Sequence, residues 1–104
     1  GSFFETAVVG EVHTLLAPLA RKAQAYHWRI HSGSEVDLVL ERDGVLYPIE
    51  IKLSSRPSRK DTRGITALRQ NYPALDIAPG LVISPVERFE QLSENDYAMP
   101  WDLA

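Results

Sequence analysis

Two alternating segments joined by Asp43-Gly44 limit the folds open to this chain more than any other part of the sequence. Residues 35–41 and 45–53 each alternate apolar and polar side chains, which is typical of β-strands that bury one face. Asp-Gly readily adopts the positive φ that a tight hairpin turn requires. The two segments are therefore predicted to be antiparallel neighbours in one sheet.

The alternation also predicts which side chains share a face. Val36, Leu38 and Leu40 are expected on one face of the first strand, with Asp37 on the opposite face. Pro48 lies within the second strand and lacks a backbone N–H, so we expect a bulge or an unpaired position there.

The remaining segments predict a mixed α+β (α/β) fold in the order α-β-β-β-α-β, with helices packed on a mixed sheet. Ile65, Leu68 and Tyr72 are the expected buried stripe of the later helix, although Gly64 is unfavourable inside it. Ser93 followed by Asp96 predicts one short helical turn. The expected elements are a helix over 3–24 that kinks at Pro18, strands over 25–31, 35–41 and 45–53, a helix from Asp61 or Thr62 to about Tyr72, a strand over 81–84, an edge strand over 86–92, and a lid of Met99, Pro100, Trp101 and Leu103.

Length and composition narrow the classes of protein. With 104 residues and 11.7 kDa, the chain is expected to form a single domain over residues 3–104, and Gly1-Ser2 is interpreted as a cloning scar. The absence of cysteine excludes disulfide scaffolds, thiolate metal sites and cysteine nucleophiles. The sequence has no phosphate-binding Gly-rich loop and no membrane-length apolar run, so we expect a cytoplasmic protein that is not itself an NTPase.

Charge is distributed unevenly along the chain. The net charge of −3 argues against a dedicated nucleic-acid binder. Six of the eleven cations nevertheless fall between Lys52 and Arg69, and acidic residues dominate 87–102. This polarity fits either two solvated faces or one phosphate-binding strip. The cations of the basic stretch are Lys52, Arg56, Arg59, Lys60, Arg63 and Arg69.

Three charged residues of the predicted hairpin are candidates for chemistry. Glu50 and Lys52 are two residues apart and therefore project from the same face, and Asp37 is expected near Glu50 on the neighbouring strand. Two carboxylates suit Mg²⁺, which retains several waters, and an ammonium group can orient a water or neutralise a phosphoryl oxygen. The alternative interpretation is a solvated sheet face with alternating charges.

These residues lie in a wider pattern that resembles the PD-(D/E)XK nuclease-like superfamily. The pattern resembles, more narrowly, the C-terminal domain of unknown function that follows a AAA-type ATPase module in many bacterial and archaeal proteins. The resemblance covers most of the chain, from Phe3 to Trp101. The motifs that carry it are Phe4-Glu5, Trp28-Arg29, Gly33-Ser34-Glu35-Val36-Asp37, Ile49-Glu50-Ile51-Lys52, Asp61-Thr62-Arg63-Gly64 and Tyr72-Pro73.

The resemblance implies a restriction-endonuclease-like core and a metal-dependent nuclease that acts on DNA with Mg²⁺ or Mn²⁺. It implies that Asp37, Glu50 and Glu5 bind the metal and that Lys52 is the catalytic lysine. Glu11 is the alternative to Glu5, and Val36 stands where the superfamily motif has proline. The residues expected to contact nucleic acid are Arg56, Arg59, Lys60, Arg63, Gln70 and Tyr72.

The same resemblance implies partners. An ATPase module, in cis or in trans, is expected, and so is a homodimer, because a domain with one site often needs two copies to cut a duplex. The alternative function is a catalytically inactive recognition or oligomerisation module of an ATPase with the same fold.

Other side chains leave two interpretations open. His27 and His31 would lie about 13 Å apart along a strand, which is too far for one tetrahedral zinc ion, whereas in a helix they would be near neighbours. Trp28 and Trp101 fit base-stacking platforms or packing in the core and lid.

Overall fold

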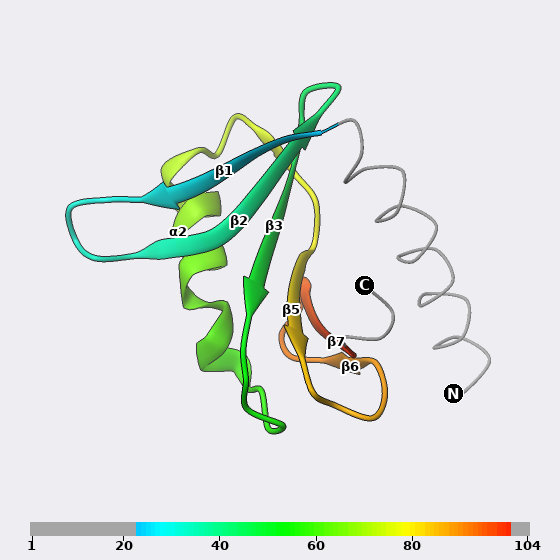
Figure 1. Ribbon diagram of the computed structural model, residues 1–104. Coiled ribbons are helices and arrows are strands. Elements are labelled where there is room, and N and C mark those ends of the chain that lie inside the picture. The colour runs from blue at the N-terminus through cyan, green and yellow to red at the C-terminus, as the bar shows by residue number, and fades with distance from the viewer. Residues whose placement is uncertain (1–22, 101–104) are drawn as a thin grey trace.

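A computed structural model describes residues 23–100 as a mixed α+β domain with one α-helix and a seven-stranded mixed sheet (Figure 1). The expected first helix and the Trp101–Leu103 part of the lid lie outside these residues. The strands are β1 (Gln24–Arg29), β2 (Glu35–Arg42), β3 (Val45–Ile51), β4 (Asp76–Ile77), β5 (Gly80–Ser84), β6 (Glu90–Gln91) and β7 (Asp96–Pro100), and the helices are the 3-10 helix η1 (Arg59–Thr62) and α2 (Arg63–Asn71).

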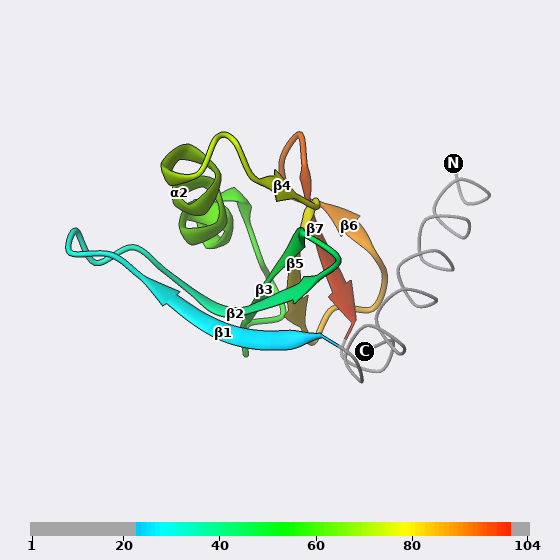
Figure 2. The same cartoon turned by 90° about the horizontal axis from the view of Figure 1, so that it is seen from above.

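The sheet has an antiparallel half and a parallel half. Its order is β1-β2-β3-β5-β7-β6, and β4 pairs with β3 beside this path. The first three strands form the predicted meander, while β3, β5 and β7 run parallel. The connection from β3 to β5 includes α2, which lies on one face of the sheet (Figure 2). The predicted strands and helix of the middle segment are thus confirmed, but the chain contains more strands than expected.

A bulge in β2 alters the predicted faces. Tyr26 pairs with Val39 and Trp28 pairs with Val36, so Asp37 and Leu38 together lie opposite the single residue His27. Val36 and Val39 consequently pack in the same cluster under α2. The prediction that Val36 shares a face with Leu38 and Leu40 is wrong, because the bulge interrupts the alternation.

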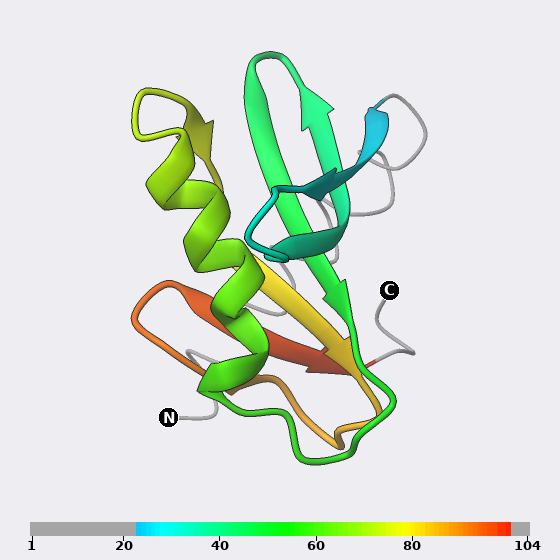
Figure 3. The same ribbon diagram turned by 90° about the vertical axis from the view of Figure 1, so that its left-hand side faces the viewer.

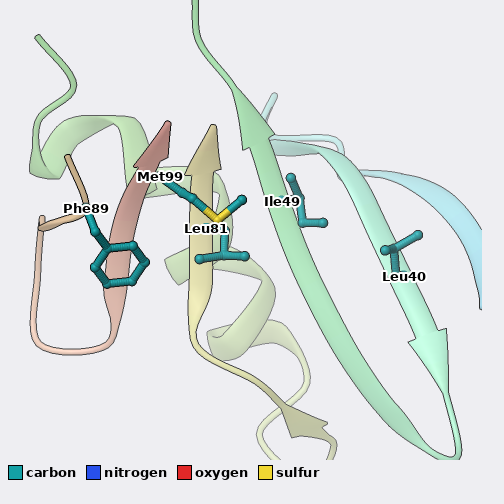
Figure 4. Close-up of a cluster of buried hydrophobic side chains, with 5 residues drawn as sticks. All are labelled: Leu40, Ile49, Leu81, Phe89 and Met99. Carbon is teal, nitrogen blue, oxygen red and sulfur yellow. The ribbon is translucent and has the colours of Figure 1, made fainter. Parts of the chain in front are cut away.

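Hydrophobic side chains pack on both faces of the sheet. The face under α2 buries Val36, Val39, Ile65 and Leu68. The opposite face buries a second cluster drawn from β2, β3, β5, β7 and the segment before β6 (Figure 4). Its members are Leu40, Ile49, Leu81, Phe89 and Met99.

Pro48 lies at a break in the pairing of β3. Leu46 pairs with Ile77 of β4, and Ile49 pairs with Leu81 of β5, so the offset changes from 31 to 32 residues across Pro48. Its missing N–H is accommodated where one parallel partner ends and the next begins. Pro48 pairs with Val39 of β2 without a bulge, so the predicted unpaired position is confirmed only on the side of the parallel strands.

The C-terminal part differs most from the prediction. Asp96–Pro100 forms the parallel strand β7 instead of a helical turn and lid, and the expected edge strand over 86–92 is reduced to Glu90–Gln91. Ser93 does donate a hydrogen bond to Asp96 Oδ2 over 2.7 Å, but the chain continues extended. A side-chain pairing typical of a helix start therefore precedes a strand here.

Asp96 is the hub of a buried polar cluster. Its side chain is 2% exposed and accepts hydrogen bonds from both terminal nitrogens of Arg69, from Ser93 Oγ and from Gly80 N. Burial acts to raise the pKa of Asp96, but the hydrogen bonds from Arg69 and Ser93 outweigh burial and lower it. The cluster joins α2 to β5 and β7.

We expect Asp96→Asn to lower the free energy of unfolding by about 2–3 kcal/mol at pH 7, because Arg69 loses its charged partner. A carboxyl with a lowered native pKa stabilises the fold above its unfolded pKa, and this contribution is lost as pH falls through the native pKa. Urea unfolding at pH 7 and pH 3 should show the difference shrinking at pH 3. Asp43→Asn, at an exposed turn, is the control and should change little.

Gly64 sets how closely α2 approaches β2. A Cβ atom at this position would lie 1.9 Å from the backbone oxygen of Glu35. The first turn of α2 packs directly on the backbone of β2, and glycine at this position leaves room for that contact.

None of the helices in residues 23–100 is both long and apolar enough to cross a membrane.

Gly64→Ala should lower the melting temperature, although alanine has the higher helix propensity. The clash is with backbone, so α2 must shift, at a cost of about 1–3 kcal/mol. Thermal unfolding measures this, with Thr66→Ala on the exposed face of α2 as control. An unchanged or raised melting temperature for Gly64→Ala would contradict the close approach.

Candidate functional site

The carboxylates of Asp37 and Glu50 meet where β2 and β3 stop pairing. Asp37 lies opposite Glu50, one step beyond the last pair, Leu38 and Ile49. Asp37 N donates to Glu50 Oε1 over 2.7 Å, and Ile51 N donates to Asp37 Oδ2 over 2.9 Å. Each carboxylate thus binds a backbone N–H of the opposite strand and keeps a second oxygen for another partner. The structure brings these two predicted residues together.

Lys52 follows β3 directly and is held at both ends. Its backbone N donates to the carbonyl of Ile83 over 2.9 Å, and its Nζ lies 3.5 Å from Asp61 Oδ1. The other carboxylate oxygen of Asp61 accepts from Ser58 N over 2.8 Å at the start of η1. Asp61, which the sequence suggested as a helix cap, therefore also fixes the candidate lysine.

A pocket of about 400 Å³ is lined by Glu50, Lys52 and Asp61, whereas Asp37 is not among its lining residues. Glu50 and Lys52 of the hairpin line one part, and Lys60, Asp61 and Arg63 line another. Ser32, Gly33 and Ser34 of the β1–β2 connection complete it, together with Glu35 at the start of β2 and Gly64 of α2. The pocket combines carboxylates with cations, which is the composition that a metal-assisted reaction at a phosphate requires.

Among the groups that line this pocket, Glu50 has the most clearly shifted pKa. The residue is 9% exposed, and burial raises the pKa of its carboxyl. The hydrogen bond from Asp37 N acts against this rise, the charge of Asp37 adds to it, and the smaller effects of Lys52 and Glu35 oppose one another. Burial therefore makes the ionised form of Glu50 less favourable than that of a free carboxyl, and a cation beside it would offset this.

The two carboxylates fit a hard divalent cation that keeps much of its water. Mg²⁺ is commonly bound through one or two carboxylates together with waters and substrate phosphates. Within residues 23–100, no three His, Asp or Glu side chains gather as a metal-binding group. Glu5, the expected third ligand, and Glu11 lie outside the described residues. Asp37 and Glu50 would hold Mg²⁺ or Mn²⁺ with the help of water and substrate oxygens.

The histidines of β1 and its turn are not arranged as a zinc site. His27 Nε2 lies 3.3 Å from Glu35 Oε2, and Arg29 shares that carboxylate. His31 lies in the turn after β1, because the strand ends at Arg29 and not at His31 as predicted.

The residues expected to contact nucleic acid divide among three places. Arg59 and Lys60 on η1 and Arg63 and Gln70 on α2 line a second hollow beside the pocket. Arg56 lies in the loop before η1, where its N–H bonds Ser54 Oγ. Tyr72 was expected in the core but is 41% exposed at the end of α2. Its exposure is explained by its position after the last helical residue.

Sequence reasoning did not assign roles to Glu35 and Asp61 in this pocket. Glu35 is part of the motif before Asp37, which was the available signal. Asp61 is the one acid within the basic stretch, and a single acid among cations indicates a partner for one of them.

Glu50→Gln should raise the melting temperature of the metal-free protein at neutral pH. Gln keeps the acceptor for Asp37 N but removes a buried charge. A carboxyl with a raised native pKa stabilises the fold below its unfolded pKa of about 4.5, and this contribution is lost as pH rises through the native pKa. Melting curves in EDTA from pH 4 to 8 should therefore diverge as pH rises. Glu41→Gln is the control, because Glu41 lies near the end of β2 that is remote from Asp37 and Glu50.

The whole chain, residues 1–104, matches the family described as Domain of unknown function (DUF4143), and the chain belongs to this family. Uncharacterized proteins of Mycobacterium bovis and Mycobacterium tuberculosis are each 31% identical to it over 102 residues. These residues are 98% of this chain and 21% of each relative, so the chain spans about a fifth of their length. No solved structure matches.

Proposed function

We propose that this domain is a metal-dependent phosphodiesterase that cleaves DNA. The observation that supports this most is the pairing of Asp37 with Glu50 across the hairpin, with Lys52 two residues on from Glu50. The raised pKa of Glu50 is consistent with a carboxylate that binds a cation. Mg²⁺ or Mn²⁺ is the proposed cofactor, with Glu5 as a proposed additional ligand.

The residues have distinct proposed roles. A divalent cation would polarise the phosphate and acidify a bound water. Asp37 and Glu50 would hold this cation through their second carboxylate oxygens. Lys52 orients the attacking water or neutralises charge that develops on the phosphoryl oxygens. Arg59, Lys60 and Arg63 hold the phosphate backbone beside the pocket, with contributions from Arg56, Gln70 and Tyr72.

The alternative is a catalytically inactive recognition or oligomerisation module of an ATPase. One observation favours it: both carboxylates already accept backbone hydrogen bonds and thereby close the end of the hairpin. The relatives are about five times longer than this chain, which leaves room for an ATPase module in cis. We propose a cytoplasmic location and a homodimer for either of the two functions.

Metal binding gives a direct test. Mg²⁺ or Mn²⁺ at about 100 times its Kd should stabilise the native protein by about 2.7 kcal/mol. For a domain of this size that corresponds to a rise in melting temperature of about 10–20 °C. Asp37→Ala should lose most of the rise, and Arg42→Ala, at the opposite end of β2, should keep it.

Cleavage separates the two functions. The 104-residue chain is incubated with single-stranded, double-stranded and branched DNA in Mn²⁺, Mg²⁺ or EDTA. We expect metal-dependent cleavage by the wild type and by Arg42→Ala, and none by Lys52→Ala. The absence of both cleavage and metal stabilisation would falsify the nuclease proposal and favour the contact module.

A further inference from the structure

A second hollow of about 640 Å³ opens beside the candidate pocket. The two share Ser34, Lys60 and Arg63, so they are neighbours along η1 and the start of α2. The second hollow extends past Thr66 to Gln70. Ser34, which precedes β2, lines both hollows, and the start of β2 lies beside α2 (Figure 3).

The two hollows differ in charge. Among the described residues, 23–100, no acidic residue lines the second, whereas Arg59, Lys60 and Arg63 do. Within residues 23–100, none of these three cations lies within ion-pair distance of a carboxylate. The hydroxyl of Thr66 and the amide of Gln70 add neutral hydrogen-bonding groups. Unpaired cations with neutral polar groups are suited to a chain of phosphates.

An exposed aromatic residue lies beyond the far end of this hollow. Tyr72 follows α2 two residues after Gln70, and its ring packs edge-on against Trp28 with centroids 6.2 Å apart. Trp28 Nε1 donates to the Tyr72 hydroxyl over 3.4 Å. These contacts restrain an aromatic ring that is 41% exposed. A restrained, exposed ring can stack on a base at a small entropic cost.

The spacing fits a strand of nucleic acid. Arg63 and Tyr72 are nine residues apart, which is about 13 Å at the helical rise of 1.5 Å. This is at most about four nucleotides, because ~3.4 Å is the spacing per phosphate along a stacked duplex strand and an unstacked single strand is more extended. A base can stack on Tyr72 only if it is unpaired, because bases in a duplex already stack on their neighbours.

We propose that this hollow binds single-stranded nucleic acid, with Arg59, Lys60 and Arg63 on its phosphates and Tyr72 stacked on an unpaired base. The inference deepens the proposed function. It rests on that function only for what happens to the bound strand, which would continue past Lys60 and Arg63 towards Glu50 and Lys52. The preferred substrate is then a single strand or an unpaired end.

The test is binding without cleavage. Fluorescence anisotropy of the 104-residue chain in EDTA is measured with labelled single-stranded DNA, single-stranded RNA of the same sequence, and duplex DNA. We expect at least one single strand to bind more tightly than the duplex. Preference for DNA or RNA identifies the sugar, and either supports the proposal.

Matched variants separate stacking from charge. Tyr72→Ala should weaken single-strand binding about five-fold or more, while Tyr72→Phe, which keeps the ring, should stay near the wild type. Lys60→Ala with Arg63→Ala should reduce the slope of log K against log salt by about 1.4, or about 0.7 for each phosphate contact. Arg42→Ala removes a cation elsewhere and should leave binding unchanged. Thermal melting confirms that each variant is folded.

Equal affinity for single strand and duplex with no effect of Tyr72→Ala would overturn the inference, as would the absence of binding at low salt. Failure of the proposed nuclease function would give a different set of results. Tyr72-dependent binding in EDTA with no cleavage in Mn²⁺ would leave the single-strand site intact and remove the nuclease. Metal-dependent cleavage that is insensitive to Tyr72→Ala would do the reverse.

Discussion

The bidentate pair of Arg69 with Asp96 connects the helix to the parallel half of the sheet. A carboxylate that is 2% exposed requires several donors, and Asp96 obtains them from α2, from Ser93 and from Gly80 at the start of β5. A Cβ atom at Gly80 would lie 2.5 Å from Asp96 Oδ1, so glycine is needed for this approach. With Gly64 against Glu35 at its other end, α2 is fixed to both halves of the sheet. The candidate pocket and the second hollow, which lie beside α2, depend on this position of the helix.

The candidate site uses the same carboxylates for structure and for chemistry. At the bulge in β2 the regular ladder ends, and Asp37 and Glu50 supply the acceptors that backbone carbonyls supply elsewhere. This bonding places the two acids reproducibly beside each other. It also keeps Glu50 buried, which raises its pKa and makes the metal-free protein less stable than its packing allows. Such a conflict between stability and charge is typical of binding sites.

The sequence predicted the hairpin, the strand after Pro79-Gly80 and the later helix because their periodicity and turn residues are local signals. It also anticipated the irregularity at Pro48 and the proximity of Asp37 to Glu50. The bulge at Asp37 could not be predicted, because it arises from pairing with β1, which depends on tertiary contacts. β7 was missed for a similar reason: the local Ser93–Asp96 signal indicates a helix, while the buried pair with Arg69 and pairing with β5 favour a strand. The exposure of Tyr72 depends on where α2 ends, and helix ends are weakly specified by sequence.

Asp61 connects the lysine of the candidate pocket to the short helix that lines the second hollow. One of its carboxylate oxygens accepts from Ser58 at the start of η1, and the other faces the ammonium of Lys52. Its side chain is 17% exposed, so solvent screens this pair less than a surface pair. The cations that would hold a phosphate backbone belong to the same short helix and the first residue of α2. Asp61 is therefore the direct contact between the short helix that lines the second hollow and the candidate catalytic lysine.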